Sequence, residues 1–415
     1  MSKITLSTHT LKIETNSGEP LVALQRGDNK KMLAGLPDQS VSCVIQDEPY
    51  GFNPNDIDVN LYLKALIQNQ DYKRGGKGIN GNPWDSDLPP LSHRFELFRV
   101  LKCGGYAVIF TKTQTIHFVM LELQKAGFEI VELLAWIHTQ GMPKVGSKIE
   151  KTETDPELLR FKNICGDLSP SMEIIILAQK PIDQKDRLEN LRIHGTGYLN
   201  LEQGKIDALY GENSYPRNVI IENNTSVLKH LNGKGDKFQA IRYLPVDSEI
   251  NQALAFSKPS VREKDLGLEN ENTPYEKLGL FNRRPVEGKN HHTTVKPLEL
   301  MRYLVRLVSH EGDIVLDSYA GSVTTGLAAI LENRRFIGAE LMPDYFDIAS
   351  RKLKNVFLKI EPQYLRNYQQ FIFETYKARI NVEKNDFFKL KLETELRAKI
   401  MQLQFEIEEI TKKAS

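Results

Sequence analysis

Residues 313–340 read DIVLDSYAGSVTTGLAAILENRRFIGAE, and this stretch decides the fold class of the chain. It opens with a β-branched apolar run that ends in an aspartate and a glycine turn, as buried strands often do. A helix-forming segment rich in small apolar residues follows, and RRFIGAE then reads as a second strand. PDYFDIASRKL, at 343–353, predicts another helix. Strands and helices that alternate in this way favour a parallel sheet.

The same pattern occurs earlier in the chain. Four apolar runs read as buried strands, namely VSCVIQD at 41–47, YAVIF at 106–110, EIVELLAWIH at 129–138 and MEIIILAQ at 172–179. TQTIHFVMLELQKAG, at 113–127, predicts a helix between the second and the third. We therefore predict an α/β fold whose parallel sheet is built from an early and a late block of sequence.

A different region lies between the two blocks. At roughly 150 residues per domain, 415 residues allow two or three domains, or one large domain that carries insertions. Residues 186–290 are rich in Gly, Asn, Pro and charge, which predicts a loop-rich insertion between the halves 1–185 and 291–356 of one α/β domain. Residues 357–415 predict a helical extension.

The predicted extension carries an apolar stripe. Its residues follow a 4-3-4-3 spacing and are Leu396, Ile400, Leu403, Ile407 and Ile410. The stripe covers only about two heptads, fewer than the three or four that a coiled coil needs. It suits packing on the chain's own domain at least as well as packing on a partner helix, which would make a homodimer.

Composition excludes several classes of protein. With 55 Lys and Arg against 54 Asp and Glu the net charge is +1, so any nucleic-acid surface must be local. We find neither a secretory start nor a run near the ~18 apolar residues of a membrane span, and expect a cytoplasmic protein without a membrane partner. Cys43, Cys103 and Cys165 are widely spaced, so we expect reduced thiols and no disulfide framework or metal site.

Two acidic residues end predicted strands of the late block. Asp317 precedes the turn that contains Gly321, and Glu340 ends the next strand 23 residues later. Ligands of open α/β sheets bind at such strand ends, where a carboxylate can accept both hydroxyls of a ribose. The pair suggests a cofactor that contains a nucleoside. An aspartate that merely caps the following helix explains Asp317 equally well.

The early block has a different candidate site, the tetrapeptide Asp47-Glu48-Pro49-Tyr50. It places a hydrogen-bond acceptor, a backbone carbonyl and an aromatic face within four residues of a strand end. These groups can hold a planar heterocycle that carries an amino group. An ordinary turn of Asp, Pro and Tyr accounts for the same four residues.

Three stretches in a defined order connect the two sites. DEPYGF at 47–52, NHHTTVKPLELMRYLVRL at 290–307 and IVLDSYAGSVTTGLAAI at 314–330 together resemble the amino-group DNA methyltransferases that use S-adenosyl-L-methionine. Their order resembles the circularly permuted β group, and segments such as GTGYLNLEQGKI at 195–206 are similar to phage-type adenine methyltransferases. The resemblance covers about residues 20–356. It implies a Rossmann-like methyltransferase sheet with 186–290 as target-recognition region.

The resemblance implies roles for individual residues. Asp47, the Glu48 carbonyl, Pro49 and Tyr50 would hold an extruded base of double-stranded DNA, with Tyr50 stacking on it. The residues that would contact S-adenosyl-L-methionine are Asp28, Thr294, Lys296, Asp317, Ser318, Gly321, Ser322 and Glu340. No metal is implied. Trp84 and Asp85 resemble a pair that follows the catalytic loop, and a Trp that anchors this loop is an equal interpretation.

The chain also departs from the family pattern. Glu48 replaces a proline, which removes a fixed φ and places a carboxylate near the pocket. Val323 replaces a glycine of the cofactor loop, so a Cβ must be accommodated at a close approach. His-Thr-Thr replaces His-Pro-Thr. These changes leave open a DNA-binding relative that methylates poorly or not at all.

The expected target base depends on the residue type at position 47. Asp at position 47 favours N6 of adenine, since the N4-cytosine enzymes more often have Ser there, and N4 of cytosine is the alternative. Methylation of protein glutamine or RNA is a further alternative, although those relatives carry Asn in this position and the opposite motif order. Candidates for phosphate contacts are Lys144, Lys148, Lys151, Arg160, Lys162, Arg283, Arg284 and Lys289, although each also reads as an ordinary solvated charge.

Overall fold

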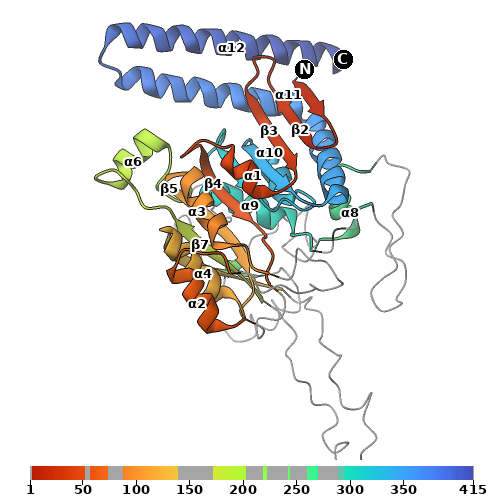
Figure 1. The fold of residues 1–415 in the computed structure, drawn as a ribbon. Helices are drawn as coiled ribbons and strands as arrows, with labels where there is room; N and C mark the ends of the chain where they lie inside the picture. Colours follow the sequence, from red (N-terminus) through yellow and green to blue (C-terminus); the bar gives the residue numbers. More distant parts are fainter. Residues whose placement is uncertain are drawn as a thin grey trace, which may run out of the picture.

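The computed structural model describes most of the chain. The described residues are 2–51, 57–72, 87–138, 172–201, 218–221, 242–243, 259–269, 289–290, 292 and 294–414. Trp84, Asp85 and all the predicted phosphate-contact residues except Lys289 lie outside these ranges. An 11-stranded mixed sheet forms the centre of the described fold (Figure 1).

The sheet joins the early and late blocks. Its strands are β1 (Lys3–Leu6), β2 (Thr10–Glu14), β3 (Pro20–Arg26), β4 (Val41–Gln46), β5 (Leu101–Thr111), β6 (Glu129–Ile137), β7 (Met172–Gln179), β8 (Val219–Ile221), β9 (Arg242–Tyr243), β10 (Ile314–Asp317) and β11 (Arg335–Glu340). Their spatial order is β1-β2-β3-β11-β10-β4-β5-β7-β6-β8-β9. β10 pairs in parallel with β4 of the early block on one side and with β11 on the other. The predicted α/β class is thereby confirmed.

Among the strands predicted from the sequence, one departs from the parallel order. β7 lies between β5 and β6 and is antiparallel to both, whereas β3, β11, β10, β4 and β5 form a parallel run. A short apolar run indicates a buried strand but not its direction. The direction of β7 has a functional consequence, because it brings the first residues of β7 to the edge where β4 and β5 end.

Helices cover both faces of the sheet. Those before β10 are α1 (Asn29–Ala34), α2 (Val59–Ile67), α3 (Leu91–Val100), α4 (Ile116–Ala126), α6 (Arg187–His194), α8 (Val261–Lys264) and α9 (Leu298–Val308). α10 (Thr324–Leu331), α11 (Pro343–Val382) and α12 (Asp386–Ala414) follow. Residues of α1, α3 and α4 share one apolar core, and those of α9, α10, α11 and α12 share the other. β4 lies between these layers and is buried along its whole length, as central parallel strands are.

The C-terminal extension is helical as predicted. α11 and α12 lie side by side, and α12 returns along α11 towards the N-terminal strands (Figure 1). Leu403, Ile407 and Ile410 of the apolar stripe are buried in the same core as α11, and Leu396 and Ile400 pack against it. The stripe is thus used within the chain, and the homodimer stays a prediction.

The predicted segments are structurally joined at two places. α11 runs without a break from Pro343 to Val382, across residue 356. β8, from the region 186–290, pairs in parallel with β6 of the main sheet. The four-segment division therefore stays a prediction about function. Among the described residues, no helix is both long and apolar enough to cross a membrane.

Candidate active site

Three acidic residues from distant parts of the chain gather at the carboxyl edge of the parallel strands. Asp317 ends β10 and Glu340 ends β11, while Asp47 directly follows β4. The register aligns Leu316 with Val44, so β4 and β10 end side by side. The two predicted sites therefore share one edge of the sheet.

Asp47 belongs to a compact polar cluster with Tyr50, Glu173 and Lys296. The Lys296 ammonium lies 2.6 Å from Oδ2 of Asp47 and 3.2 Å from Oε2 of Glu173. The Tyr50 hydroxyl is 2.7 Å from Oδ1 of Asp47 and 3.0 Å from the same Glu173 oxygen. Because a hydroxyl carries one proton, Tyr50 shares it between two carboxylates.

Burial sets the protonation of this cluster. It raises the pKa of Asp47, and the charge of Glu173 adds to this effect while Lys296 opposes it. Burial also raises the pKa of Tyr50 well above its usual range, with both carboxylates contributing. Burial alone would lower the pKa of Lys296, but Asp47 and Glu173 outweigh it and raise that pKa. Lys296 is therefore an ammonium and Tyr50 a neutral phenol at neutral pH.

Sequence reasoning missed Glu173 and grouped Lys296 with the cofactor residues. Glu173 is the second residue of β7, and its position at the site follows from the antiparallel direction of that strand. A charged residue inside the apolar run MEIIILAQ was the only signal in the sequence. The structure places Lys296 on Asp47, with its ammonium 5.4 Å from the ring centroid of Tyr50 and 5.1 Å from that of Phe110.

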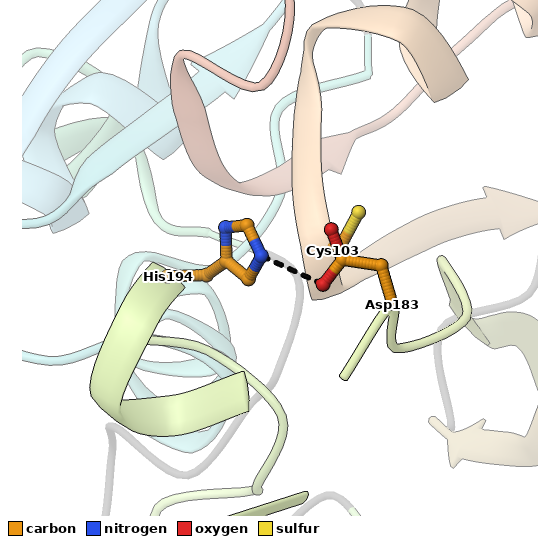
Figure 2. Close-up of side chains that lie close together, drawn as sticks. All are labelled: Cys103, Asp183 and His194. Carbon is orange, nitrogen blue, oxygen red and sulfur yellow. Dashed lines mark hydrogen bonds and ion pairs between the residues drawn. The ribbon is translucent and has the colours of Figure 1, made fainter. Parts of the chain in front are cut away.

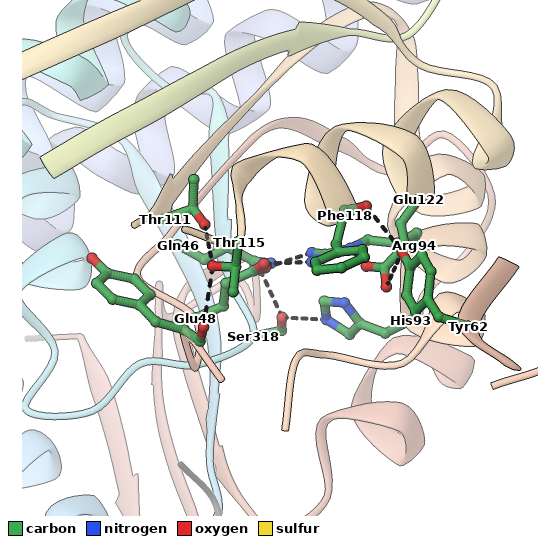
Figure 3. A network of polar contacts seen from close by, with 11 residues as sticks. Gln46, Glu48, Tyr62, His93, Arg94, Thr111, Thr115, Phe118, Glu122 and Ser318 are labelled. Carbon is green, nitrogen blue, oxygen red and sulfur yellow. Dashed lines mark hydrogen bonds and ion pairs between the residues drawn. The ribbon is translucent and has the colours of Figure 1, made fainter. Parts of the chain in front are cut away.

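The Glu48 carboxylate is turned into the protein, which corrects the expectation that it would lie near the pocket. Glu48 is 3% exposed, and both of its oxygens accept hydrogen bonds from the guanidinium of Arg94 on α3 (Figure 3). Arg94 is fully buried and also donates from Nε to Glu122 on α4, at 3.2 Å. The residue that breaks the family's tetrapeptide pattern is therefore an internal ion-pair partner.

Further hydrogen bonds hold the backbone of the tetrapeptide loop. The Thr115 hydroxyl donates to the carbonyl of Tyr50 at 3.2 Å, and the Lys112 ammonium donates to the carbonyl of Gly51 at 2.7 Å. Both donors come from the segment between β5 and α4. The loop is thus fixed by its neighbours at several points along its length.

The turn after β10 forms the second part of the site. Asp317 accepts from the backbone N–H of Tyr319 at 3.0 Å. Glu340 accepts from Gly321 N–H at 2.8 Å and from Met342 N–H at 2.7 Å. Gly321 has φ +52, and a Cβ there would lie 2.8 Å from Nε2 of His292, so this position requires glycine.

Asp317 and Glu340 can accept hydrogen bonds from a bound ligand. Burial raises the pKa of each to about 7, and nearby carboxylates add to the shift, Asp47 and Glu48 for Asp317 and Asp317 for Glu340. A bound group that brings hydroxyl donors or positive charge would relieve this cost. A ribose, an ammonium and a sulfonium are such groups, so these acids fit the cofactor that the sequence predicts.

The other predicted cofactor residues lie around this turn. Ser322 is 3% exposed, and the Ser318 hydroxyl is engaged by Gln46 and His93, each at 2.8 Å. Asp28 caps α1 by accepting from Lys30 N–H, and the preceding Gly27 donates its N–H to the carbonyl of Glu340. Asp28 therefore lies next to the end of β11.

Thr294, a predicted cofactor residue, and Lys289, a predicted phosphate contact, both form hydrogen bonds within the chain. Thr294 is exposed, and its N–H donates to Nδ1 of His292 at 3.3 Å. Lys289 donates its side chain to the carbonyls of Leu268 and Glu269, at 2.8 Å each. The Lys289 ammonium is thus used within the chain.

Val323 departs from the family's glycine at a place where glycine has an advantage. It precedes the first residue of α10 and has φ +67 and ψ +32, the left-handed conformation that β-branched residues avoid. Its side chain is fully buried in the core beneath α10. The Cβ is therefore accommodated, at the cost of backbone strain.

A second polar cluster lies at the opposite edge of the sheet. Cys103 near the start of β5, Asp183 after β7 and His194 at the end of α6 bring one donor atom each within 4.8 Å of one another (Figure 2). Nε2 of His194 and Oδ1 of Asp183 are 2.8 Å apart, a hydrogen-bond distance shorter than two ligands of a zinc ion keep. Burial and the bond to Asp183 raise the pKa of the Cys103 thiol. We interpret the cluster as a hydrogen-bonded chain.

Comparisons with solved structures return methyltransferases at low identity. A complex of M1.HpyAVI with SAM is 18% identical with a TM-score of 0.41, and the match covers 80% of this chain and 100% of that one. The cytosine-N4-specific PvuII DNA methyltransferase is 15% identical with a TM-score of 0.44, over 82% of this chain and 92% of that one.

Sequence comparisons are more specific. Type II methyltransferase M.HindIII of Haemophilus influenzae is 28% identical over 340 residues, which are 77% of this chain and 90% of that protein. DNA adenine methyltransferase YhdJ of Escherichia coli is 44% identical over 63 residues, 15% of this chain and 21% of that protein. The sequence pattern of a family described as DNA methylase matches residues 41–351, which is 311 of the 415 residues. The chain therefore belongs to the N6/N4 amino DNA methyltransferases, the family in which S-adenosyl-L-methionine is the methyl donor.

Proposed function

We propose that this DNA methyltransferase modifies N6 of adenine. The observation that carries the proposal is that Asp47 and Tyr50 share one edge of the sheet with the buried acids Asp317 and Glu340. A base held by Asp47 and Tyr50 would face a methyl donor held by Asp317 and Glu340. The choice of adenine over cytosine rests on the aspartate at position 47.

Asp47 has the chemistry required of a base-binding acceptor. The lone pair of an exocyclic amine is delocalised into the ring, and an accepted N–H bond helps to localise it on nitrogen. The carboxylate of Asp47 and the carbonyl of Glu48 would each accept from one of the two N–H groups. Tyr50, as a neutral phenol, offers a ring on which the base stacks, which offsets part of the few kcal/mol needed to extrude a base from the duplex.

Lys296 keeps Asp47 in its carboxylate form, and Glu173 helps to hold Lys296 and Tyr50 in place. The ammonium compensates the charge of Asp47 in a buried site, and so favours the carboxylate that an amine needs as acceptor. Glu173 forms a second ion pair with the Lys296 ammonium and accepts a hydrogen bond from Tyr50. We assign these two residues to the positioning of Asp47 and Tyr50.

The cofactor supplies a methyl group carried on a sulfonium centre. Glu340 would accept the ribose hydroxyls, exchanging one of its present bonds to Gly321 or Met342. Asp317, Gly321 and Ser322 would line the methionine end, together with Thr294 and Lys296. Ser318 would contribute its backbone, because its hydroxyl is engaged by Gln46 and His93. Asp28 would lie near the adenine ring.

Double-stranded DNA is the proposed substrate, and residues 186–290 with their flanks are the proposed region for sequence recognition. A transfer assay with labelled cofactor and unmethylated DNA, followed by digestion to nucleosides, tests the whole proposal. We expect label in N6-methyladenine. Label in N4-methylcytosine would move the chain to the other branch of its family, and binding without any transfer would identify a DNA-binding relative.

A further inference from the structure

The side chain of Glu48 is the starting point, because it replaces a proline of the family's tetrapeptide. Proline stiffens a loop by fixing φ, and glutamate has no such restriction. In this chain both Glu48 oxygens are bound by the two terminal nitrogens of Arg94, in the two-pronged geometry that orients both groups. The exposed fractions of the two side chains are 0% for Arg94 and 1% for Glu48.

We infer that Arg94 is a positioning residue, which replaces the stiffness of the missing proline with a buried ion pair and so holds Asp47 and Tyr50 in register for the base. The inference rests on the proposed function. Arg94 does not contact Asp47 or Tyr50 in any interaction of the described residues, and it acts through the Glu48 side chain between them.

Arg94 is itself held from the other side. Its Nε donates to Glu122 on α4, and Glu122 also accepts from the Tyr62 hydroxyl of α2 at 3.1 Å. Burial raises the pKa of Glu122 to about 7, against the opposing charge of Arg94. Glu122 can therefore take up a proton if Arg94 is removed, whereas the fully engaged Glu48 depends on Arg94 for its countercharge.

A chain of hydrogen bonds connects this ion pair to the cofactor turn (Figure 3). The Gln46 amide donates to Oε2 of Glu48 at 2.8 Å, so its carbonyl oxygen faces Ser318 and accepts from that hydroxyl at 2.8 Å. Nε2 of His93 is 2.8 Å from the same hydroxyl. Since an ionised carboxylate only accepts, the charge of Glu48 fixes the direction of every bond in this chain. The ion pair is thus linked through Gln46 to Ser318 in the turn after β10.

The direct test removes Arg94 in two backgrounds. In the wild-type background, Arg94→Met should lower kcat about 100-fold, the order of loss that a misplaced reacting group causes, with the Kd for S-adenosyl-L-methionine within about threefold of wild type. In the Glu48→Pro background the same change should leave kcat within about twofold of Glu48→Pro, because the proline ring then fixes φ and the ion pair to Glu48 is already absent. An effect of Arg94→Met on kcat that is present with Glu48 and absent without it distinguishes positioning from a general effect on folding.

Arg99→Met is the matched control, since Arg99 lies on the same helix and binds the carboxylates of Glu96 and Asp38 and the carbonyls of Leu33 and Leu36, none of which belongs to the tetrapeptide. It should leave kcat within about twofold of wild type. Unchanged kcat in Arg94→Met, or a further loss in the Glu48→Pro background, would overturn the inference. If Arg94→Met does not fold, the comparison between Glu48→Pro and Glu48→Pro/Arg94→Met still decides, and lower activity of the double variant overturns the inference.

Failure of the proposed function has a separate readout. Wild-type enzyme that transfers no methyl group to any DNA contradicts that function without using an Arg94 variant. The coupling between Arg94 and Glu48 is then measured from the melting temperatures, without cofactor, of the wild type, Arg94→Met, Glu48→Pro and the double variant. Additive shifts would show that Arg94 and Glu48 do not act together and would overturn the inference, whereas a smaller loss in the double variant than in Arg94→Met supports it.

Discussion

The ammonium of Lys296 lies 2.6 Å from Oδ2 of Asp47, although 249 residues separate them in the chain. The contact joins the segment before α9 to the loop after β4, so the late block supplies the countercharge for the early block's proposed base-binding residue. Since both groups are largely buried, neither is well solvated without the other.

Lys296→Met should therefore shift the pH dependence of methyl transfer. Without the ammonium, burial and Glu173 raise the pKa of Asp47 further, so its carboxylate forms only at higher pH. We expect kcat at pH 7 to fall and the acid limb of the kcat profile to move to higher pH. Lys296→Arg, which keeps the charge, should retain the wild-type limb. An unshifted profile in Lys296→Met would show that Lys296 does not set the charge of Asp47.

Asp47→Ala should abolish methyl transfer and leave cofactor binding intact. The variant removes the acceptor for the amino group, whereas Asp317 and Glu340 remain in place at the ends of β10 and β11. Calorimetric titration with S-adenosyl-L-methionine and the labelled transfer assay measure the two properties separately. Retained transfer would remove Asp47 from the proposed site.

Cofactor binding should strengthen as the pH rises through about 7. Burial holds the pKa of both Asp317 and Glu340 at about 7, and only their carboxylate forms accept hydroxyl donors or attract a cation. Binding should also release protons, which titrations in buffers of different ionisation enthalpy would detect. Glu340→Gln should bind more weakly and lose part of the pH slope. A slope equal to that of wild type in Glu340→Gln would contradict the role of this residue.

The stability of the protein without cofactor should change in the opposite direction. The raised pKa values mean that the folded state holds more protons than the unfolded state between about pH 4 and 7, so the free energy of unfolding falls as pH rises across that window. Asp317→Asn should flatten this fall, because the amide does not ionise. Denaturant melts at pH 5 and pH 8 give the comparison. Equal slopes for the two proteins would mean that Asp317 ionises normally when folded.

Val323→Gly should be more stable than Val323→Ala. Both variants lose the buried methyl groups of valine, but alanine keeps a Cβ in the left-handed conformation and glycine does not. The left-handed penalty of about 1–2 kcal/mol predicts a difference of about 1 kcal/mol in favour of glycine. Urea melts of the two variants measure this difference. At an ordinary helix position the alanine variant would be the more stable of the two. The order of stabilities therefore tests the backbone strain itself.

Leu403→Ala should destabilise the packing of α12 on α11. Leu403 is 4% exposed and lies in the core shared by both helices, where a Leu→Ala change costs about 2–5 kcal/mol. Met401→Ala is a control on the same helix, because Met401 is 71% exposed. Thermal melts should show a large shift only for Leu403→Ala. Similar small shifts would mean that the stripe is not packed within the chain.

Much of the fold was predictable because its signals are local. The strand β10, its glycine turn and α10 follow from the apolar pattern of residues 313–331, and the helical tail from the lack of Gly and Pro beyond Pro362. Ends of parallel strands share an edge, so Asp317 and Glu340 could be placed together before the structure was known. The direction of β7 could not, since an apolar run of eight residues reads the same in both directions.

The sequence by itself determined which residue types stand at the ends of β4, β10 and β11, and the order of three stretches, at 47–52, 290–307 and 314–330, was enough to indicate the family. Only the tertiary structure decided what those side chains contact. It placed Lys296 on Asp47, brought in Glu173, and turned Glu48 towards Arg94. The physical reason is that a buried charge must find its partner in space, and the partner's position depends on strand direction and helix packing rather than on neighbouring residues in the chain.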